Sequence, residues 1–473
     1  MHLSDATWEA AEQRLKRLFA ELSVGECAPL AQGVFDNLVQ PLVRHAWAEV
    51  DTADLLTLRA AESLRKSIVA RLLWTGRQGF EWNYNVFLQT PGLPRAVRED
   101  PVAANEVFFP RGLEREALRI MESYPELARL WALQLEAWVV FVREFLGHAR
   151  AFFGDKPPIQ DLELDCSDHH HCHRSVVRVA DRDGKSWFYK PRSKHHEHAW
   201  FSLLQWLNDE RFPSAFYIPE LHSLDEHCWM VAVIPQPCRL EDEVKSFYFR
   251  AGAQLYLFYV LGGTDLHADN LVACGAHPVV IDCETLFHPK ITEAGASDSL
   301  EQSVLRCGML PFPRAGSEVS SSALCCDEPG PHAVFCGEQR IDPAAYVDDI
   351  VSGYSQMHQF LTNNQRRRLT FCARTSALAK ESWRHVVRPT SHYRAALEHS
   401  LSPTFLRNGT ARTEALRQFV GDGATSGAEF CALEVCDIPI FHQPGTARPF
   451  FFDPDLENSL GHIRSALKTA KLT

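Results

Sequence analysis

Hydrophobic residues recur at helical spacing through the first 154 positions. The clearest series are Trp8, Leu15, Leu18 and Leu22, and then Leu127, Leu130, Trp131, Trp138 and Phe145. Pro125 stands just ahead of the second series, where the first turn of a helix tolerates proline. Because such a stripe normally packs against a core rather than around a ligand, we expect residues 1–154 to form a mostly helical region.

A different pattern begins at residue 155 and continues to residue 238. Residues 175–180 and 186–190 flank Asp183-Gly184 with strand-like periodicity, which indicates a β-hairpin. The next features are a helical series of Trp200, Leu203, Leu204 and Leu207, an apolar strand at 228–234, and Pro235 and Pro237. The two prolines favour a hinge at the end of this small predicted lobe.

Residues 239–473 are predicted to form a larger lobe. A helical pattern over 241–261 ends at Gly262-Gly263. Residues 271–273 and 278–282 are predicted as short strands around Gly275, so Asn270 and Asp282 would lie at neighbouring strand ends. Residues 290–345, with clusters of Gly and Pro, are expected to be a long loop, followed by further helices and short strands.

Composition limits the class of protein. With 473 residues the chain is too long for one simple core, and its 45% hydrophobic content can fill two or three packed units. The net charge of −12 comes from interspersed acidic residues, which argues against nucleic acid as the main partner. The 14 cysteines are scattered, no secretory signal is present and no apolar run is long enough for a membrane span, so we expect a cytoplasmic protein.

Polar residues suited to phosphoryl transfer gather around the two short strands. Asp265-x-His267-x-x-Asn270 has the Asp-to-Asn interval of a protein-kinase catalytic loop, in which the Asp engages the substrate hydroxyl and the Asn binds metal. Asp282-x-Glu284 begins twelve residues after Asn270, at the end of an apolar strand. Oxygen ligands suit Mg²⁺, so Asn270, Asp282 and Glu284 are the predicted metal ligands, with ATP and Mg²⁺ as cofactors.

Lys190 completes a kinase-like order of parts. It ends the predicted hairpin, where it is placed to reach the phosphates of ATP, and it precedes the hinge, the long helix and the Asp/Asn loop. The glycine-rich loop and the other signature sequences of protein kinases are absent, and His267 after Asp265 is closer to lipid-kinase-like enzymes. Taken alone, an Asp-x-His-x-x-Asn string usually serves as a turn or a cap. The predicted fold class is α+β, a lipid-kinase-like two-lobed core with an additional mostly helical N-terminal region and long insertions.

A second polar cluster occupies residues 168–173, with the sequence Asp-His-His-His-Cys-His. Imidazole and thiolate are the preferred ligands of zinc. Contiguous side chains on a strand point to alternate faces, however, and do not readily converge on one ion, so we expect no zinc here. The alternative is that Asp168 and His170 line the phosphate side of the small lobe.

These motifs together resemble a known family. Residues 261–270, Leu-Gly-Gly-Thr-Asp-Leu-His-Ala-Asp-Asn, and 278–289, Pro-Val-Val-Ile-Asp-Cys-Glu-Thr-Leu-Phe-His-Pro, resemble the dehydratase domain of class II lanthipeptide synthetases, the LanM family. The likeness extends to Asp168-x-His170, to 189–192, 303–311 and 387–390, and more weakly to 124–128. It therefore covers nearly the whole chain.

The resemblance implies a two-step reaction on a ribosomally made precursor peptide with a leader. Ser or Thr would be phosphorylated with ATP and Mg²⁺, and phosphate would then be eliminated to leave dehydroalanine or dehydrobutyrine. By position, the phosphorylation residues are Lys190, Asp265, His267, Asn270, Asp282 and Glu284, and Asp168 and His170 lie near the nucleotide. Arg384 and Thr390 fall on positions tied to elimination, and Arg384 or Arg388 would supply the bidentate contact to the departing phosphate.

Departures from the family pattern leave alternatives open. The family usually has glycine where Ser167 and His173 stand. No sequence of a C-terminal zinc-dependent cyclase follows, so a separate cyclase is an expected partner, unless the product is only dehydrated or phosphorylated, or the chain is a truncated relative. The competing functions are a peptide or small-molecule kinase without elimination and a catalytically inactive module that binds the precursor peptide.

Overall fold

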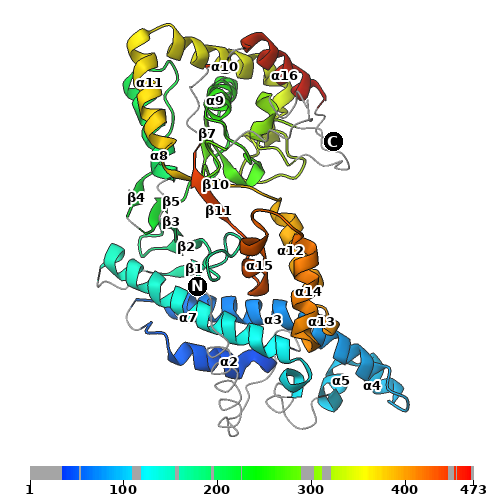
Figure 1. Cartoon of the computed structure of the whole chain (residues 1–473). Coiled ribbons are helices and arrows are strands. Elements are labelled where there is room, and N and C mark those ends of the chain that lie inside the picture. The colour runs from blue at the N-terminus through cyan, green and yellow to red at the C-terminus, as the bar shows by residue number, and fades with distance from the viewer. Residues whose placement is uncertain are drawn as a thin grey trace. The chain divides into compact units, whose positions relative to one another are not determined.

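A computed structural model of the chain describes residues 35–52, 55–108, 119–154, 159–192, 196–224, 226–288, 303–311, 321–445, 452–453 and 455–469. Helices and short antiparallel strands alternate along it, which confirms the α+β class (Figure 1). The chain divides into two compact units, each built from two stretches of sequence: Met1–Pro191 with Arg388–Ile440, and Arg192–Val387 with Phe441–Thr473. The predicted lobe boundaries after residues 154 and 238 stay a prediction.

The first unit is mostly helical, and its described residues up to 154 are mainly helical, as the spacing predicted. Its described helices are α2 (Asp36–Ala48), α3 (Leu58–Leu88), α4 (Arg95–Glu99), α5 (Pro101–Phe108), α7 (Pro125–Phe153), α12 (Thr390–Ser400), α13 (Pro403–Arg407), α14 (Gly409–Val420) and α15 (Ser426–Glu434). Pro125 occupies the first turn of α7, and the predicted stripe from Leu127 to Phe145 is buried. Both sequence predictions are confirmed, whereas the series from Trp8 to Leu22 lies outside the described residues.

The predicted hairpin is present in this unit. Strands β2 (Val177–Ala180) and β3 (Ser186–Lys190) pair antiparallel, with Val177 opposite Tyr189, and β1 (Asp161–Glu163) pairs with the other edge of β2. The turn contains Gly184 with φ +79°, a backbone conformation that glycine adopts without steric cost. The sequence periodicity thus located these strands to within two residues.

Residues 388–440 return to the first unit after the chain has built most of the second. Arg412 of α14 is fully buried and contacts Glu126 of α7 at 3.2 Å, and Arg129 binds the same carboxylate at 2.7 Å. Arg412 also donates to the backbone carbonyls of Leu433 and Glu434. One buried carboxylate therefore ties the returning segment to the central helix of the unit.

The second unit combines helices with short hairpins. Its described elements are α8 (His196–Asp209), β4 (Leu221–Ser223), β5 (Cys228–Val231), α9 (Glu241–Val260), η1 (Ala268–Asn270), β6 (Leu271–Cys274), β7 (His277–Val280), η2 (Val304–Cys307), β8 (Phe335–Cys336), β9 (Gln339–Arg340), η3 (Pro343–Tyr346), α10 (Val347–Thr362), α11 (Gln365–Leu378), β10 (Ser382–His385), β11 (Phe441–Pro444) and α16 (Leu456–Thr469). The predicted helical series from Trp200 to Leu207 lies in α8, and the predicted helix of 241–261 is α9, so both predictions are confirmed. Strand β5 ends three residues earlier than the predicted 228–234.

Helices α9 and α10 approach each other closely through glycine. A Cβ atom at Gly252 would lie 1.9 Å from the carbonyl oxygen of Ile350, and one at Gly353 would lie 1.8 Å from the carbonyl oxygen of Phe249. Real side chains never come so near to backbone atoms, so the two helices pack backbone against backbone here. Helix α9 leads directly into the Asp265 loop, and this contact therefore fixes the base of the candidate site.

The predicted long loop at 290–345 is irregular wherever it is described. Residues 289–302 and 312–320 lie outside the described part, and the rest carries only the short elements η2, β8, β9 and η3. Across the described residues, no helix is both long and apolar enough to cross a membrane.

Candidate active site

The loop that carries Asp265 begins where α9 ends. Leu261 caps the helix, and Gly262 with φ +68° reverses the chain. Asp265 itself has φ +61°, a left-handed conformation that is uncommon outside glycine and that clusters at functional sites. The backbone thus presents the Asp265 carboxyl at a position that an extended strand or a helix would not give.

Two other segments hold this loop in place. The amide of Leu266 donates to the carbonyl of Cys307 at 2.9 Å, and the amide of Ala268 donates to Ser321 at 3.0 Å. Gly308 has φ +84°, and a Cβ there would lie 3.0 Å from the Leu266 amide nitrogen. The motif at 303–311 therefore supports the backbone of the Asp265 loop.

The structure brings Asn270 and Asp282 to neighbouring strand ends, as predicted. Strands β6 and β7 pair with Leu271 opposite Val280, and the Ile281 amide donates to the Asn270 carbonyl at 3.0 Å. The Asn270 side-chain nitrogen donates to the backbone carbonyl of Asp265 at 2.9 Å. Since this bond uses the amide nitrogen, the amide oxygen is the atom of Asn270 that suits a metal ion.

Glu284 is held by two arginines. One of its oxygens accepts a hydrogen bond from Arg192 and the other from Arg384 of β10. Burial would raise the pKa of this carboxyl, but the two guanidinium groups hold it well below its usual range. Glu284 was predicted as a metal ligand from sequence, and that role stays a prediction. With both oxygens engaged, the carboxylate orients Arg384 in this structure.

The pKa of Asp265 is shifted in the opposite direction from that of Glu284. The residue is exposed to solvent, yet desolvation of its carboxyl beside the cluster raises the pKa, and the nearby carboxylates of Asp282 and Glu284 raise it further, against His267 and Arg384. A raised pKa makes a carboxylate a better proton acceptor. Asp265 is therefore electrostatically suited to engage a substrate hydroxyl.

Acidic side chains gather around this point. Among the described residues, the carboxyl groups of Glu197, Asp265, Asp282 and Glu284 interact with the guanidinium groups of Arg192 and Arg384. Such an acidic cluster is a suitable environment for a divalent cation.

Magnesium fits the donors that are present. Among the described residues, no three His, Cys, Asp or Glu side chains converge closely enough to hold a metal by themselves. Mg²⁺, however, is usually bound through one or two carboxylates together with substrate phosphates and water. Asn270 and Asp282 supply protein oxygens for such a shared site. The buried hydroxyl of Thr264, beside Asp265 in the chain, has no hydrogen-bond partner among the described residues.

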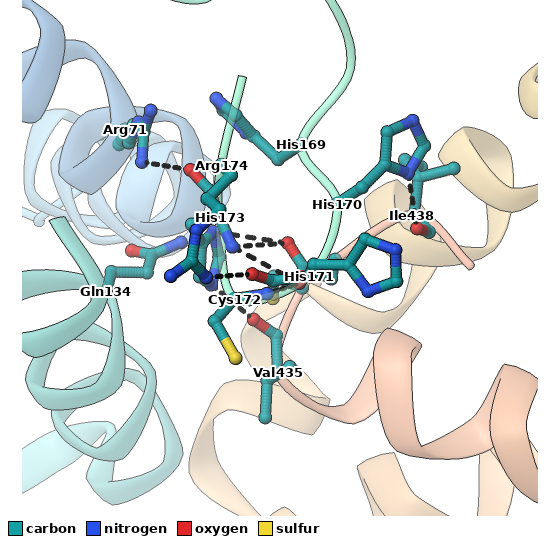
Figure 2. Close-up of polar contacts among 12 residues, drawn as sticks. Arg71, Gln134, His169, His170, His171, Cys172, His173, Arg174, Val435 and Ile438 are labelled. Atoms are coloured by element: carbon teal, nitrogen blue, oxygen red, sulfur yellow. Dashed lines mark hydrogen bonds and ion pairs between the residues drawn. The ribbon is translucent and has the colours of Figure 1, made fainter. Parts of the chain in front are cut away.

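Asp168 and His170 belong to the first unit. Arg394 of α12 donates to the Asp168 carboxylate at 2.8 Å, and the His170 Nδ1 lies 2.7 Å from the carbonyl oxygen of Ile438. Figure 2 shows His169, His170, His171 and His173 pointing in different directions from one loop. Their assignment to the nucleotide stays a prediction.

This loop is a turn and not the strand that the sequence argument assumed. His171, Cys172 and His173 all have positive φ, of +49°, +67° and +62°. The amides of Cys172 and His173 donate to the Asp437 carboxylate at 2.6 and 3.0 Å, and the His173 ring lies 2.8 Å from the Val435 carbonyl (Figure 2). Because left-handed residues cost energy, these bonds to the returning segment are what keep the turn in this form.

His173 occupies a position where the family pattern has glycine, and its φ of +62° is one that glycine favours. The imidazole is buried, and burial lowers its pKa from 6.5 to about 4. The folded protein therefore keeps His173 neutral while the unfolded chain takes up a proton. The free energy of unfolding therefore has its full value above the unfolded pKa of 6.5. It decreases as the pH falls from there toward about 4.

In the variant His173→Gly, the free energy of unfolding should therefore depend less on pH in the acidic range. We expect the loss of unfolding free energy between about pH 7 and about pH 5 to be about 2 kcal/mol smaller than in wild type, because one proton-linked group is removed. Urea titrations at the two pH values measure this. His171→Gly is the matched control, since it removes an exposed imidazole from the same left-handed turn. An unchanged profile in His173→Gly would contradict the buried neutral imidazole.

The remaining predicted residues fall in different places. Lys190 is buried at the end of β3 and Thr390 begins α12, both in the first unit. Arg384 lies in the second unit with the Asp265 loop. Arg388 donates to the Glu429 carboxylate and to the Val420 carbonyl, at 2.8 and 2.9 Å.

Three residues with roles in these arrangements were not identified from sequence: Arg192, Glu197 and Asp437. Arg192 stands two positions after Lys190 within the 189–192 motif, and this position was a usable signal. Glu197 stands between histidines at the start of α8, where nothing in the sequence marked it as an ion-pair partner. Asp437 lies far along the sequence from the turn that it holds.

Comparisons with known proteins agree with the motifs. A family model described as "Domain of unknown function (DUF4135)" matches residues 124–335 and 327–443. The chain is also similar to the lacticin 481/lactococcin biosynthesis protein LcnDR2 of Lactococcus lactis subsp. lactis, with 21% identity over 329 residues, covering 58% of this chain and 35% of that protein.

The chain thus spans about a third of the length of that relative. These two matches confirm the resemblance to class II lanthipeptide synthetases that the motifs indicated. The family model covers every residue assigned to the candidate site, from Asp168 to Thr390, and most of the sequence. The chain belongs to the family described as Domain of unknown function (DUF4135).

Proposed function

We propose that this protein dehydrates Ser and Thr residues of a lanthipeptide precursor by phosphorylation and elimination. One observation carries the proposal: Asp265, Asp282 and Arg384 belong to one electrostatic cluster. In the proposed reaction they would serve as proton acceptor, metal ligand and phosphate-binding cation respectively. The similarity to a lantibiotic biosynthesis protein supports a peptide as the substrate. A lipid-kinase-like two-lobed core is part of the same proposal.

In the phosphorylation step, Asp265 would accept the proton of the substrate hydroxyl as its oxygen attacks the terminal phosphorus of ATP. Its raised pKa suits this task. Asn270 and Asp282 would hold Mg²⁺, which neutralises phosphate charge when bound. Lys190, Asp168 and His170 are assigned to the nucleotide and His267 to the same catalytic loop, all by resemblance.

In the elimination step, a base removes the α-proton of the phosphorylated residue. The electrons of that C–H bond form the new C=C bond, and the C–O bond breaks as phosphate leaves. A guanidinium group stabilises the developing charge on the phosphate. Arg384 suits this role because, among the described residues, its side chain donates a hydrogen bond only from Nη1, to Glu284. The other nitrogens of the guanidinium group can then bind a ligand. Arg388 suits it less because Glu429 and Val420 occupy its donors. Thr390 is assigned to this step by resemblance.

Co-expression with a precursor peptide tests the proposal. Mass spectrometry of the peptide should show loss of water with the wild-type protein and accumulated phosphate with Arg384→Ala, because only the second step loses its cation. The Arg388→Ala variant is the matched control and should still yield dehydrated peptide if it folds. Phosphopeptide from wild type would favour a kinase without elimination. An unmodified peptide with every variant would favour a binding module.

A further inference from the structure

Arg192 is surrounded by carboxylates. Its guanidinium lies 2.5 Å from Glu197 and 3.5 Å from Asp282, and it also donates to Glu284. Glu197 is in the first turn of α8, whereas Asp282 and Glu284 follow β7. One side chain therefore joins the start of α8 to the segment after β7, and Arg192 itself stands 92 positions before Glu284.

The two carboxylates beyond Glu197 have different tasks in the proposed reaction. Asp282 is the proposed metal ligand, and Glu284 holds Arg384, the proposed phosphate ligand. Arg192 contacts both, so a shift of its guanidinium would move the metal side and the phosphate side together. Its Nε atom is buried without a hydrogen-bond partner among the described residues, so the group is held by ion pairs rather than by backbone carbonyls.

Stability alone is a weak reason for this arrangement. Desolvation offsets most of the attraction in a buried ion pair, and apolar side chains of similar volume often stabilise a fold as well. A guanidinium group stays charged in proteins, and the contacts to Glu197, Asp282 and Glu284 surround that charge with carboxylates. The planar fork of a guanidinium can bind several carboxylates at fixed angles, which a lysine ammonium cannot do.

We propose that Arg192 is a positioning residue that sets the geometry of Asp282 for metal and, through Glu284, of Arg384 for phosphate. This inference rests on the proposed function and adds one residue that controls both of its steps. It differs from a purely structural ion pair in a measurable way. A structural pair would change stability, whereas a positioning residue changes metal affinity and elimination even in the folded protein.

The test compares Arg192→Lys with a matched control, Arg367→Lys. Arg367 has 18% side-chain exposure against 19% for Arg192, pairs with Glu210 in the same unit, and lies over the ring of Phe360. Groups that orient metal ligands typically contribute 10–100-fold to affinity or activity. We therefore expect Arg192→Lys to weaken Mn²⁺ binding about 10-fold, measured by electron paramagnetic resonance with ADP present. Elimination from a synthetic phosphopeptide should slow by a similar factor, and Arg367→Lys should change neither.

Unchanged Mn²⁺ affinity and elimination in folded Arg192→Lys would overturn the inference. Circular dichroism reports whether each variant folds, and Glu197→Gln provides a second, isosteric way to loosen Arg192 if the lysine variant does not. The Mn²⁺ measurement does not depend on turnover. An inactive wild type that still binds Mn²⁺ more tightly than Arg192→Lys would refute the proposed reaction and leave the positioning of Asp282 standing.

Discussion

Replacing Asp282 with asparagine should abolish both phosphorylated and dehydrated peptide. The change keeps the size of the side chain but removes the carboxylate proposed to bind metal beside Asn270, and it takes one carboxylate from the cluster around Arg192. A bound metal contributes several kcal/mol to phosphoryl transfer, so we expect the rate to fall on the order of 10³-fold or more. Mass spectrometry of a co-expressed precursor peptide, with purified enzyme and ATP as confirmation, measures the loss.

Asp269→Asn is the control for this substitution. Asp269 is in the Asp265 loop, but its side chain is 88% exposed and lies 3.6 Å from His267. Its variant should retain nearly full activity. Wild-type levels of product from Asp282→Asn would remove Asp282 from the metal site and with it the proposed phosphorylation step.

Gly353→Ala should destabilise the second unit by about 3–5 kcal/mol, more than the roughly 1–3 kcal/mol that is typical of overpacked sites. The added methyl group would lie 1.8 Å from the Phe249 carbonyl oxygen, and no rotamer can relieve a clash between a Cβ and a backbone atom. Helices α9 and α10 must then separate. Because whole domains are stable by only about 5–15 kcal/mol, a large part of the unit's stability would be lost. Urea unfolding followed by circular dichroism measures the change.

Gly461→Ala on α16 should instead stabilise the protein. Nothing lies within 4 Å of a Cβ at Gly461, and alanine is the better helix former by about 0.5–1 kcal/mol. Equal unfolding midpoints for Gly353→Ala and Gly461→Ala would show that α9 and α10 do not touch through their backbones.

The features that could be predicted from the sequence are those decided by residues close together along the chain. The hairpin at 177–190 follows from alternation around Asp183-Gly184, and helix α9 follows from its apolar spacing and its glycine stop. The proximity of Asn270 and Asp282 required only two short strands and the Gly275 turn. Each of these inferences depends on neighbours within about twenty residues, where spacing and turn chemistry decide the structure.

Features that depend on distant residues were not accessible in the same way. The two-arginine contact of Glu284 joins residues 92 and 100 positions away, so the spacing that predicts a metal ligand gave no sign that this carboxylate also holds Arg384. The left-handed turn at 171–173 exists because Asp437, from a returning segment, accepts its amides. No local propensity favours three consecutive non-glycine residues with positive φ.

The return of residues 388–440 to the first unit decides how the protein can be dissected. A protein shortened to residues 1–191 would keep α7 but would leave Glu126 without Arg412 and the 171–173 turn without Asp437. Removing one partner from a buried ion pair typically costs about 3–5 kcal/mol. The first unit is thus a discontinuous folding unit, and its isolated study would require the 388–440 fragment supplied in trans or fused by a short linker.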